Sequence, residues 1–259
     1  MSTESVRGQG YVPVEEWPDL TAMVESFGEP ELPPTDALAG RELTLRLDDG
    51  RPVALEFIDA RRLRRGGGRI DAYTAIEARP GIFLVDILSG EGRSAENTTI
   101  ALDLGTGRAT VATSTLFDRD GETRARTAFA HAAVGDAAAP PHPPSTGLVG
   151  KRILYRYSDR DHYEHIYLNG GTFTWHCIRG AEQGLADTER TRTWEIAEDL
   201  FLFFWTEAVM PVEAVLLIDL RHMRSLGRMF GWDPAPDALV HLPFSSRATV
   251  LNETTYPES

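Results

Sequence analysis

The chain has 259 residues, with 39 acidic against 26 basic side chains and a formal net charge of −13. Hydrophobic residues make up 42% and charged residues 25%, a composition that excludes a disordered chain. A field of this sign repels nucleic acid. The longest apolar run, Leu200 to Trp205, falls far short of the ~20 residues that a membrane helix needs.

The N-terminal sequence has no apolar core of the kind that directs export. Cys177 is the single cysteine, which excludes an internal disulfide and suits a reducing compartment. We therefore expect a cytoplasmic protein that contacts neither nucleic acid nor membrane. The sequence leaves a homodimer open.

Prolines mark two segments that cannot lie inside a sheet. Residues 1–35 carry five prolines and one short helical candidate, Leu20 to Phe27, and predict an N-terminal arm or lid packed on a barrel. Residues 136–146, DAAAPPHPPST, predict a stiff linker. The linker separates an N-terminal unit, 36–135, from a C-terminal unit, 147–259.

The N-terminal unit has the short alternating segments of antiparallel strands, bounded by turn residues. The strands expected there cover 42–47, 52–58, 82–88, 98–104 and 108–116. The basic run 61–65, followed by three glycines, predicts a solvated hairpin loop. A phosphate-binding loop is the weaker alternative, because no Lys-Ser/Thr pair follows the last glycine.

Three motifs recur in the same order in both units, which predicts duplication of one barrel-like unit. The pairs are 38–47 with 148–157, 81–86 with 199–204, and 99–104 with 215–220. Sustained helical periodicity is absent from both halves. The predicted fold is therefore mainly β, with two tandem lipocalin- or calycin-like antiparallel barrels after an N-terminal arm.

The two units diverge at one strand face. Where the first unit has Leu43, Leu45 and Leu47, the second has Ile153, Tyr155 and Tyr157. Inward-facing tyrosines need partners for their hydroxyls, or a ligand. A functional cavity is therefore expected in the second barrel.

Further aromatic and titratable residues of the second unit share strand faces by two-residue alternation. Tyr163 and His165 lie on one face, and Trp205 shares a face with Glu207. Glu207 ends an otherwise apolar strand. Desolvation would raise its proton affinity and suit it to acid–base work, although a strand-end glutamate facing water fits the sequence about equally well.

The histidines give a weaker signal. No HxH or HExxH pattern brings metal ligands together, so we expect no metal site. His165 or His176 is better placed to hydrogen-bond a ligand in the cavity.

Several motifs of the second unit resemble the MoaF-like family, whose name refers to molybdenum cofactor biosynthesis. They lie at 175–180, 184–187, 199–207 and 219–227, and the resemblance covers roughly residues 36–232. The resemblance implies an N-terminal and a C-terminal barrel unit.

The second unit is also distantly similar to phenolic acid decarboxylases, which are small lipocalin-like barrels. The matching motifs are Tyr155-Arg156-Tyr157, Tyr163-Glu164, Trp205-Thr206-Glu207 and the glycines Gly180 and Gly184. This similarity implies that the two tyrosines bind a substrate carboxylate and that Glu207 is the catalytic acid. In that family an arginine follows the second glycine, where this chain has Leu185. Arg179, Arg190 and Arg192 are the candidates to replace it.

These patterns predict a cofactor-independent acid–base enzyme of the decarboxylase, isomerase, hydratase or cyclase type. Its substrate would be a small conjugated or aromatic molecule in the second barrel. Glu207, Tyr155 and Tyr157 are the expected catalytic residues. The expected substrate-binding residues are Trp175, His165, His176, Arg179, Tyr163 and Trp205. A non-catalytic lipocalin-like carrier is the alternative, and a scaffold role is a weaker third.

Overall fold

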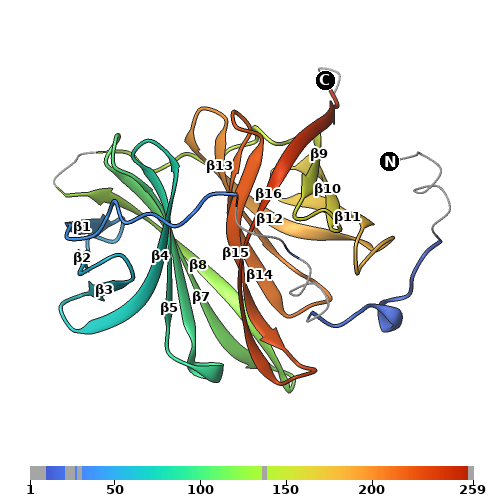
Figure 1. The fold of residues 1–259 in the computed structure, drawn as a ribbon, viewed down its shortest axis with the longest axis horizontal. Helices are drawn as coiled ribbons and strands as arrows, with labels where there is room; N and C mark the ends of the chain where they lie inside the picture. Colours follow the sequence, from blue (N-terminus) through green and yellow to red (C-terminus); the bar gives the residue numbers. More distant parts are fainter. Residues whose placement is uncertain (1–9, 21–26, 28–30, 136–138, 256–259) are drawn as a thin grey trace.

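The computed structural model describes residues 10–20, 27, 31–135 and 139–255. The described residues fold almost entirely as antiparallel strands, arranged as two closed barrels of eight strands that lie side by side (Figure 1). The prediction of a mainly β protein with two tandem antiparallel barrels is confirmed.

Each barrel is an up-and-down meander in which every strand pairs with its neighbours in the chain. The first barrel closes where β1 pairs with β8, with Leu45 opposite Val134. Its strands are β1 (Glu42–Leu47), β2 (Pro52–Phe57), β3 (Arg62–Arg65), β4 (Arg69–Arg79), β5 (Ile82–Ser89), β6 (Glu96–Asp103), β7 (Arg108–Arg119) and β8 (Glu122–Val134).

The second barrel closes where β9 pairs with β16, with Tyr155 opposite Ala248. Its strands are β9 (Lys151–Arg156), β10 (His162–Asn169), β11 (Thr172–Arg179), β12 (Ala186–Ala197), β13 (Leu200–Thr206), β14 (Val212–Asp219), β15 (Arg224–Asp233) and β16 (Ala238–Glu253). Two 3-10 turns complete the described elements, η1 (Val14–Glu16) and η2 (Gly92–Ser94).

The repeated motifs occupy equivalent places in the two barrels. The second pair lies on the fifth strand of each barrel, β5 and β13, and the third pair lies on the sixth, β6 and β14. Each motif of the first pair begins in a turn whose glycine, Gly40 or Gly150, has a φ of +75° or +85°. Such angles favour glycine because it has no Cβ to clash. The repeat is therefore structural as well as sequential.

The basic run was wrongly predicted to be a loop. Arg62–Arg65 forms β3, which pairs with β2 and β4, and the following glycines make the turn. Carboxylates on other strands balance these charges, because Arg64 pairs with Glu56 of the adjacent β2 and Arg65 lies 3.1 Å from Glu96 of β6. The cross-strand partners could not be read from a run of arginines alone.

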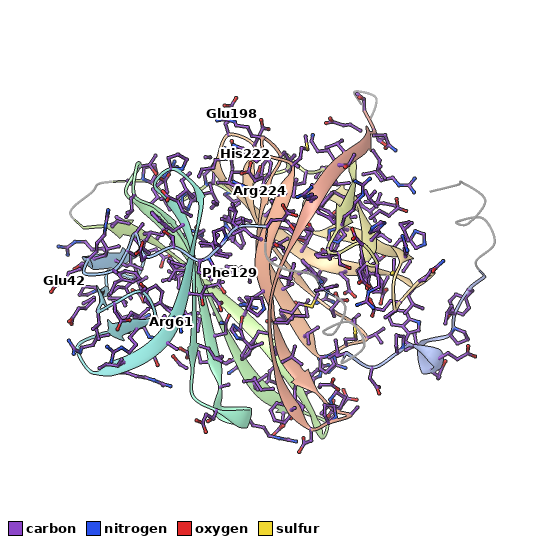
Figure 2. All side chains as sticks on the ribbon, in the orientation of Figure 1. Glu42, Arg61, Phe129, Glu198, His222 and Arg224 are labelled. Carbon is purple, nitrogen blue, oxygen red and sulfur yellow. The ribbon has the colours of Figure 1, made fainter. Side chains whose placement is uncertain are left out.

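A buried interface joins the two barrels. Apolar side chains of β4–β7 pack against those of β12–β15. Phe129 of β8 lies between the barrels (Figure 2), and the centre of its ring is 4.4 Å from the ring centre of Trp194. Arg228 of β15 is 1% exposed and donates to the hydroxyls of Thr99 and Ser114 at 3.0 and 2.6 Å. At one end of this interface Arg79 pairs with Asp219 at 2.6 Å.

The prolines hold their segments outside the strand order of the barrels. The described part of the expected linker, 139–146, runs beside β12, where Glu195 donates its amide to Pro143 O and Ser145 donates to Thr193 O, both at 2.9 Å. Most of the expected helix, residues 21–26, lies outside the described residues. No helix in the described part of the chain is long and apolar enough to cross a membrane.

The described parts of residues 10–35 contact both barrels (Figure 1). Trp17, Leu20 and Phe27 pack against the core of the second barrel. Thr35 then donates its amide to Ala75 O of β4 at 2.8 Å, in the first barrel. The N-terminal segment therefore brings apolar side chains to the second barrel before the first barrel begins.

Candidate functional site

Strand alternation places a set of aromatic side chains inside the second barrel. Neighbouring strands align them in layers, with Tyr155 opposite Tyr163 and His165 opposite Trp175. The inward aromatic residues of β9–β13, all buried, are Tyr155, Tyr163, His165, Tyr167, Phe173, Trp175, Phe201, Phe203 and Trp205. The interior is thus built from rings, several of which carry polar atoms.

A small cavity of about 20 Å³ remains among these rings. This is enough for about one water molecule. Six of the predicted site residues line it: Tyr157, Tyr163, His165, Trp175, Trp205 and Glu207. The other four lining residues are Phe27, Glu182, Met210 and Met229, which the sequence analysis did not single out.

Glu207 lies at the centre of the polar contacts in this cavity. Its side chain is 5% exposed, and its two carboxyl oxygens accept the indole N–H groups of Trp175 at 3.1 Å and Trp205 at 2.5 Å. Burial raises the pKa of Glu207 well above its usual range, and the nearby Glu189 carboxyl raises it further. Glu207 is therefore an enclosed acid rather than a glutamate facing water.

Glu189 of β12 places a second buried carboxyl group near Glu207, and the two form a pair. Glu189 is buried and accepts the backbone N–H of Ala208 at 2.9 Å. Burial also raises the pKa of Glu189. Two carboxylates close together in a low dielectric repel each other, which favours a bound proton on the pair.

A third buried carboxyl group, Glu182, accepts the hydroxyl of Tyr163 at 2.6 Å. Burial raises the pKa of Glu182, although the Tyr163 hydrogen bond opposes this rise. Burial likewise raises the pKa of the nearby Cys177 thiol to about 12. Cys177 is therefore an inert thiol rather than a nucleophile.

Tyr155 faces a different part of the interior from Glu207. Its hydroxyl pairs with that of Tyr167 at 2.8 Å, and the Tyr167 hydroxyl lies 3.3 Å from Nδ1 of His165. Burial lowers the pKa of His165 to about 3, so its ring is neutral. This chain of three polar groups ends at the cavity wall through His165.

Tyr157 lines the cavity together with Phe27 from the N-terminal segment. The two rings stack with their centres 4.6 Å apart and their planes 15° apart. The side chain of Tyr157 is 7% exposed, and burial raises its pKa. Among the described residues, no side chain or backbone group hydrogen-bonds its hydroxyl.

Two predicted substrate-binding residues, His176 and Arg179, lie outside the lining of this cavity. His176 is on the outer face of β11, where its Nδ1 lies 2.9 Å from Glu164. Alternation puts it opposite the inward Trp175 and Cys177. Arg179 ends β11 and is exposed.

The expected substitutes for the decarboxylase arginine also face away. Arg190 and Arg192 are exposed on β12, while Leu185 is buried in the core of the second barrel. Among the described residues, the cavity lining contains no Arg or Lys. No group of three or more His, Cys, Asp or Glu side chains in the described ranges is arranged to hold a metal ion.

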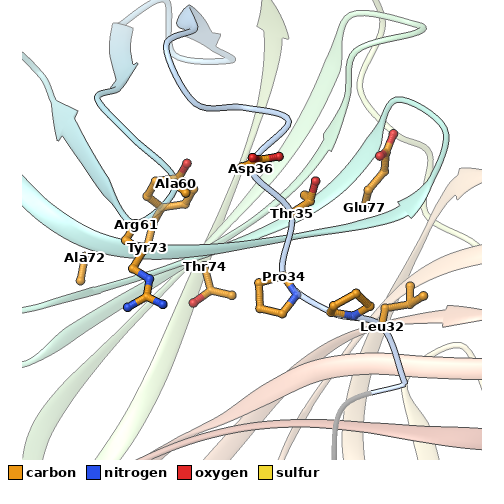
Figure 3. A pocket seen from close by; sticks show the side chains of 11 residues that line it. Leu32, Pro34, Thr35, Asp36, Ala60, Arg61, Ala72, Tyr73, Thr74 and Glu77 are labelled. Atoms are coloured by element: carbon orange, nitrogen blue, oxygen red, sulfur yellow. The ribbon is translucent and has the colours of Figure 1, made fainter.

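The first barrel offers a contrasting surface feature (Figure 3). An open groove of about 980 Å³ runs between residues 32–36 and strand β4. Its charged side chains are Asp36 and Arg61, which are exposed, and Glu77, which is half-buried. The groove lacks the enclosed, convergent polar groups that mark ligand sites.

The fold and the cavity define a two-barrel protein whose second barrel encloses an acidic, aromatic-lined site. Family models described as the MoaF N-terminal domain and the MoaF C-terminal domain match residues 15–118 and 142–254. Protein MoaF of Klebsiella aerogenes is 35% identical over 234 residues, which cover 85% of this chain and 88% of the relative. The chain belongs to the MoaF family.

A comparison with solved structures finds a weaker likeness. A chain from Burkholderia vietnamiensis, provisionally described as a beta-lactamase, is 19% identical with a TM-score of 0.35. The match covers 40% of this chain and 96% of that chain.

Proposed function

We propose that this protein binds a small aromatic or conjugated molecule in the second barrel and that Glu207 transfers a proton on it without a bound cofactor. The observation that carries the proposal is the enclosure of Glu207. Two indole N–H groups orient its carboxyl group, and burial together with Glu189 raises its pKa. A carboxyl group kept protonated near neutral pH is suited to act as a general acid.

The surrounding residues support the reaction in different ways. Trp175 and Trp205 fix the Glu207 carboxyl group and exclude water from it. The Tyr157 hydroxyl is available to hydrogen-bond an oxygen of the ligand. Tyr155 acts indirectly, because its hydrogen bond to Tyr167 orders the Tyr167 ring beside His165.

The proton balance favours a double-bond isomerisation or a related cyclisation. Glu207 gives its proton to one end of a conjugated system, and the carboxyl pair takes a proton from the other end. The pair therefore returns to its starting state without a metal, an oxidant or a reductant. The nearby Glu189 carboxyl group raises the proton affinity of the Glu207 carboxylate that forms, which favours return of a proton from the other end of the ligand.

Entry of the ligand requires the ring of Phe27 to move. A cavity of about 20 Å³ does not hold an aromatic molecule, and Phe27 already occupies a ring-sized position against Tyr157. We propose that the ligand ring replaces Phe27 there. The described N-terminal residues would then close the site over the ligand.

A non-catalytic carrier is the second candidate. The absence of a cationic side chain from the described cavity lining favours it, because such a group would orient an anionic substrate for turnover. Under this proposal the Glu189–Glu207 pair serves only to hydrogen-bond the ligand.

Glu207→Gln decides between the two candidates. The change keeps the size and one indole contact, because the amide oxygen still accepts an N–H whereas the amide nitrogen cannot, and it removes the transferable proton. Turnover should therefore fall by about 10²- to 10⁴-fold while binding persists. Ligand that co-purifies with the protein is identified by native mass spectrometry, and its conversion is followed by chromatography. Glu198→Gln, on the exposed surface beside Arg221, is the matched control. An unchanged conversion rate in Glu207→Gln contradicts the catalytic proposal, and the absence of any conversion by the wild type favours the carrier.

A further inference from the structure

We propose that the ligand meets the Glu189–Glu207 pair with an uncharged oxygen, as in an aromatic aldehyde, ketone or phenol, and that the pair rejects carboxylates. This inference rests on the proposed function and names the substrate class of the same site. It departs from the implication of the decarboxylase resemblance, in which a substrate carboxylate is bound.

The first argument is the balance of charge around the cavity. Glu182, Glu189 and Glu207 are buried within it or beside it. Their hydrogen-bond donors are neutral: two indoles, one tyrosine hydroxyl and one backbone amide. A ligand carboxylate would add a negative charge to this cluster in a low dielectric, and the described lining residues include no Arg or Lys to offset it.

The second argument is the Tyr157 hydroxyl. Its side chain is 7% exposed and lines the cavity, yet no described residue hydrogen-bonds the hydroxyl. A ligand that enters the cavity would exclude water from this hydroxyl, so the ligand is expected to supply a hydrogen-bond partner in place of water. A neutral carbonyl or hydroxyl oxygen can accept from Tyr157 and from the carboxyl pair together.

The third argument concerns the shape that the ligand must have. Phe27 stacks on Tyr157 at 4.6 Å and makes edge contacts with Tyr163 and Phe244 at 6.4 and 6.0 Å. These contacts define an aromatic slot beside Glu207. A planar ring in that slot, with its oxygen toward the cavity, would reach both hydrogen-bonding groups.

A cationic ligand fits less well, although rings and carboxylates attract cations in general. Both oxygens of Glu207 already accept an indole N–H, and the pair retains a proton. The pair therefore presents a hydrogen-bond donor, whereas an ammonium group needs acceptors.

Three matched compounds test the proposal: cinnamaldehyde, cinnamate and cinnamylamine. Their binding to the full chain is measured at neutral pH by the quenching of tryptophan fluorescence, since Trp175 and Trp205 line the cavity, and by calorimetry. We expect the aldehyde to bind about tenfold more tightly than either charged compound. Equal or tighter binding of cinnamate overturns the inference, and tightest binding of cinnamylamine replaces it with a cation site. If none of the three binds, the proposed function fails as well.

Glu189→Gln provides the second test. Removal of one carboxyl group reduces the repulsion of an anion, so the preference for the aldehyde over cinnamate should shrink by about threefold or more. The carboxylic-acid infrared band of Glu207 should also disappear at a lower pH than in the wild type. Glu198→Gln is the matched surface control. An unchanged preference and an unchanged band in a folded Glu189→Gln variant overturn the role of the pair.

Discussion

The two barrels have the same strand order but different interiors. The first is filled mainly by aliphatic side chains, and its buried Tyr73 donates its hydroxyl to Asp59 O at 2.7 Å. The second is filled by aromatic rings and encloses Glu207, with the Tyr157 hydroxyl at the wall of a cavity. The comparison teaches that one topology supports a mainly aliphatic core in one copy and an aromatic interior with a buried carboxyl group in the other.

The two barrels also differ in their buried carboxyl groups, which lower the stability of the second barrel unless other interactions offset them. The shared interface, with Arg228 bonded to Thr99 and Ser114 of the first barrel, supplies such interactions. We infer that the first barrel acts as a support for the second.

The largest expected effect tests whether both interiors are equally important for stability. Leu45→Ala in the first barrel should lower the free energy of unfolding by about 2–5 kcal/mol, and Phe173→Ala in the second by about 3–5 kcal/mol, because each leaves a cavity in a packed core. Denaturant unfolding measures both. Ligand binding should survive Leu45→Ala and be weakened by Phe173→Ala. If either variant lost less than about 1 kcal/mol of unfolding free energy, the substituted residue would not be part of a tightly packed core in that barrel.

A second prediction concerns the ring that occupies the aromatic slot. Phe27→Ala should increase the affinity for an aromatic ligand by up to about tenfold, because the ligand no longer competes with a stacked ring worth about 0.5–1.5 kcal/mol. Calorimetric titration with cinnamaldehyde measures the change. Val14→Ala, on the exposed part of the same segment, is the control. Weaker binding by Phe27→Ala would mean that Phe27 forms part of the binding site.

The third prediction is a pH dependence of stability that belongs to the second barrel. The pKa values of Glu182, Glu189 and Glu207 are raised in the folded state. The folded state therefore binds more protons than the unfolded state above the ordinary glutamate pKa, so stability falls as pH rises from there toward the folded pKa values. Thermal unfolding across this range should show the loss, and Glu207→Gln should reduce it. An identical pH profile in that variant would contradict the assignment.

The smallest expected effect distinguishes the roles of two tyrosines, Tyr73 in the first barrel and Tyr157 in the second. Tyr73→Phe removes a hydrogen bond to a backbone oxygen and should cost about 1 kcal/mol of stability, with no effect on ligand binding. Tyr157→Phe should leave stability nearly unchanged but weaken binding of a carbonyl ligand. Chemical denaturation measures the stability of both variants, and ligand titration measures their binding, so together they check these opposite effects. The reverse pattern would place the functional hydroxyl in the first barrel.

Much of the fold could be predicted from local sequence patterns. The strand 42–47 was predicted with the bounds that the structure has, and the duplicated motifs lie on corresponding strands. Three strands were not predicted: β3 in the basic run, β4 in a stretch of mixed composition and β8 in an alanine-rich stretch. In each of them the alternation of apolar and polar residues is weak. These strands form because their neighbours in the barrel need partners.

The sequence predicted the candidate site only where the alternation of side chains along a strand was informative. A two-residue period predicted which side chains share a strand face, such as Trp205 and Glu207, since neighbouring side chains on a strand point to opposite sides. It left open whether Glu207 faces the interior or water. Barrel closure and cross-strand register decided the rest. They brought Glu189 to Glu207, turned Tyr155 toward Tyr167 and placed Phe27, from a distant segment, against Tyr157. Such contacts depend on the path of the whole chain, which no local period encodes.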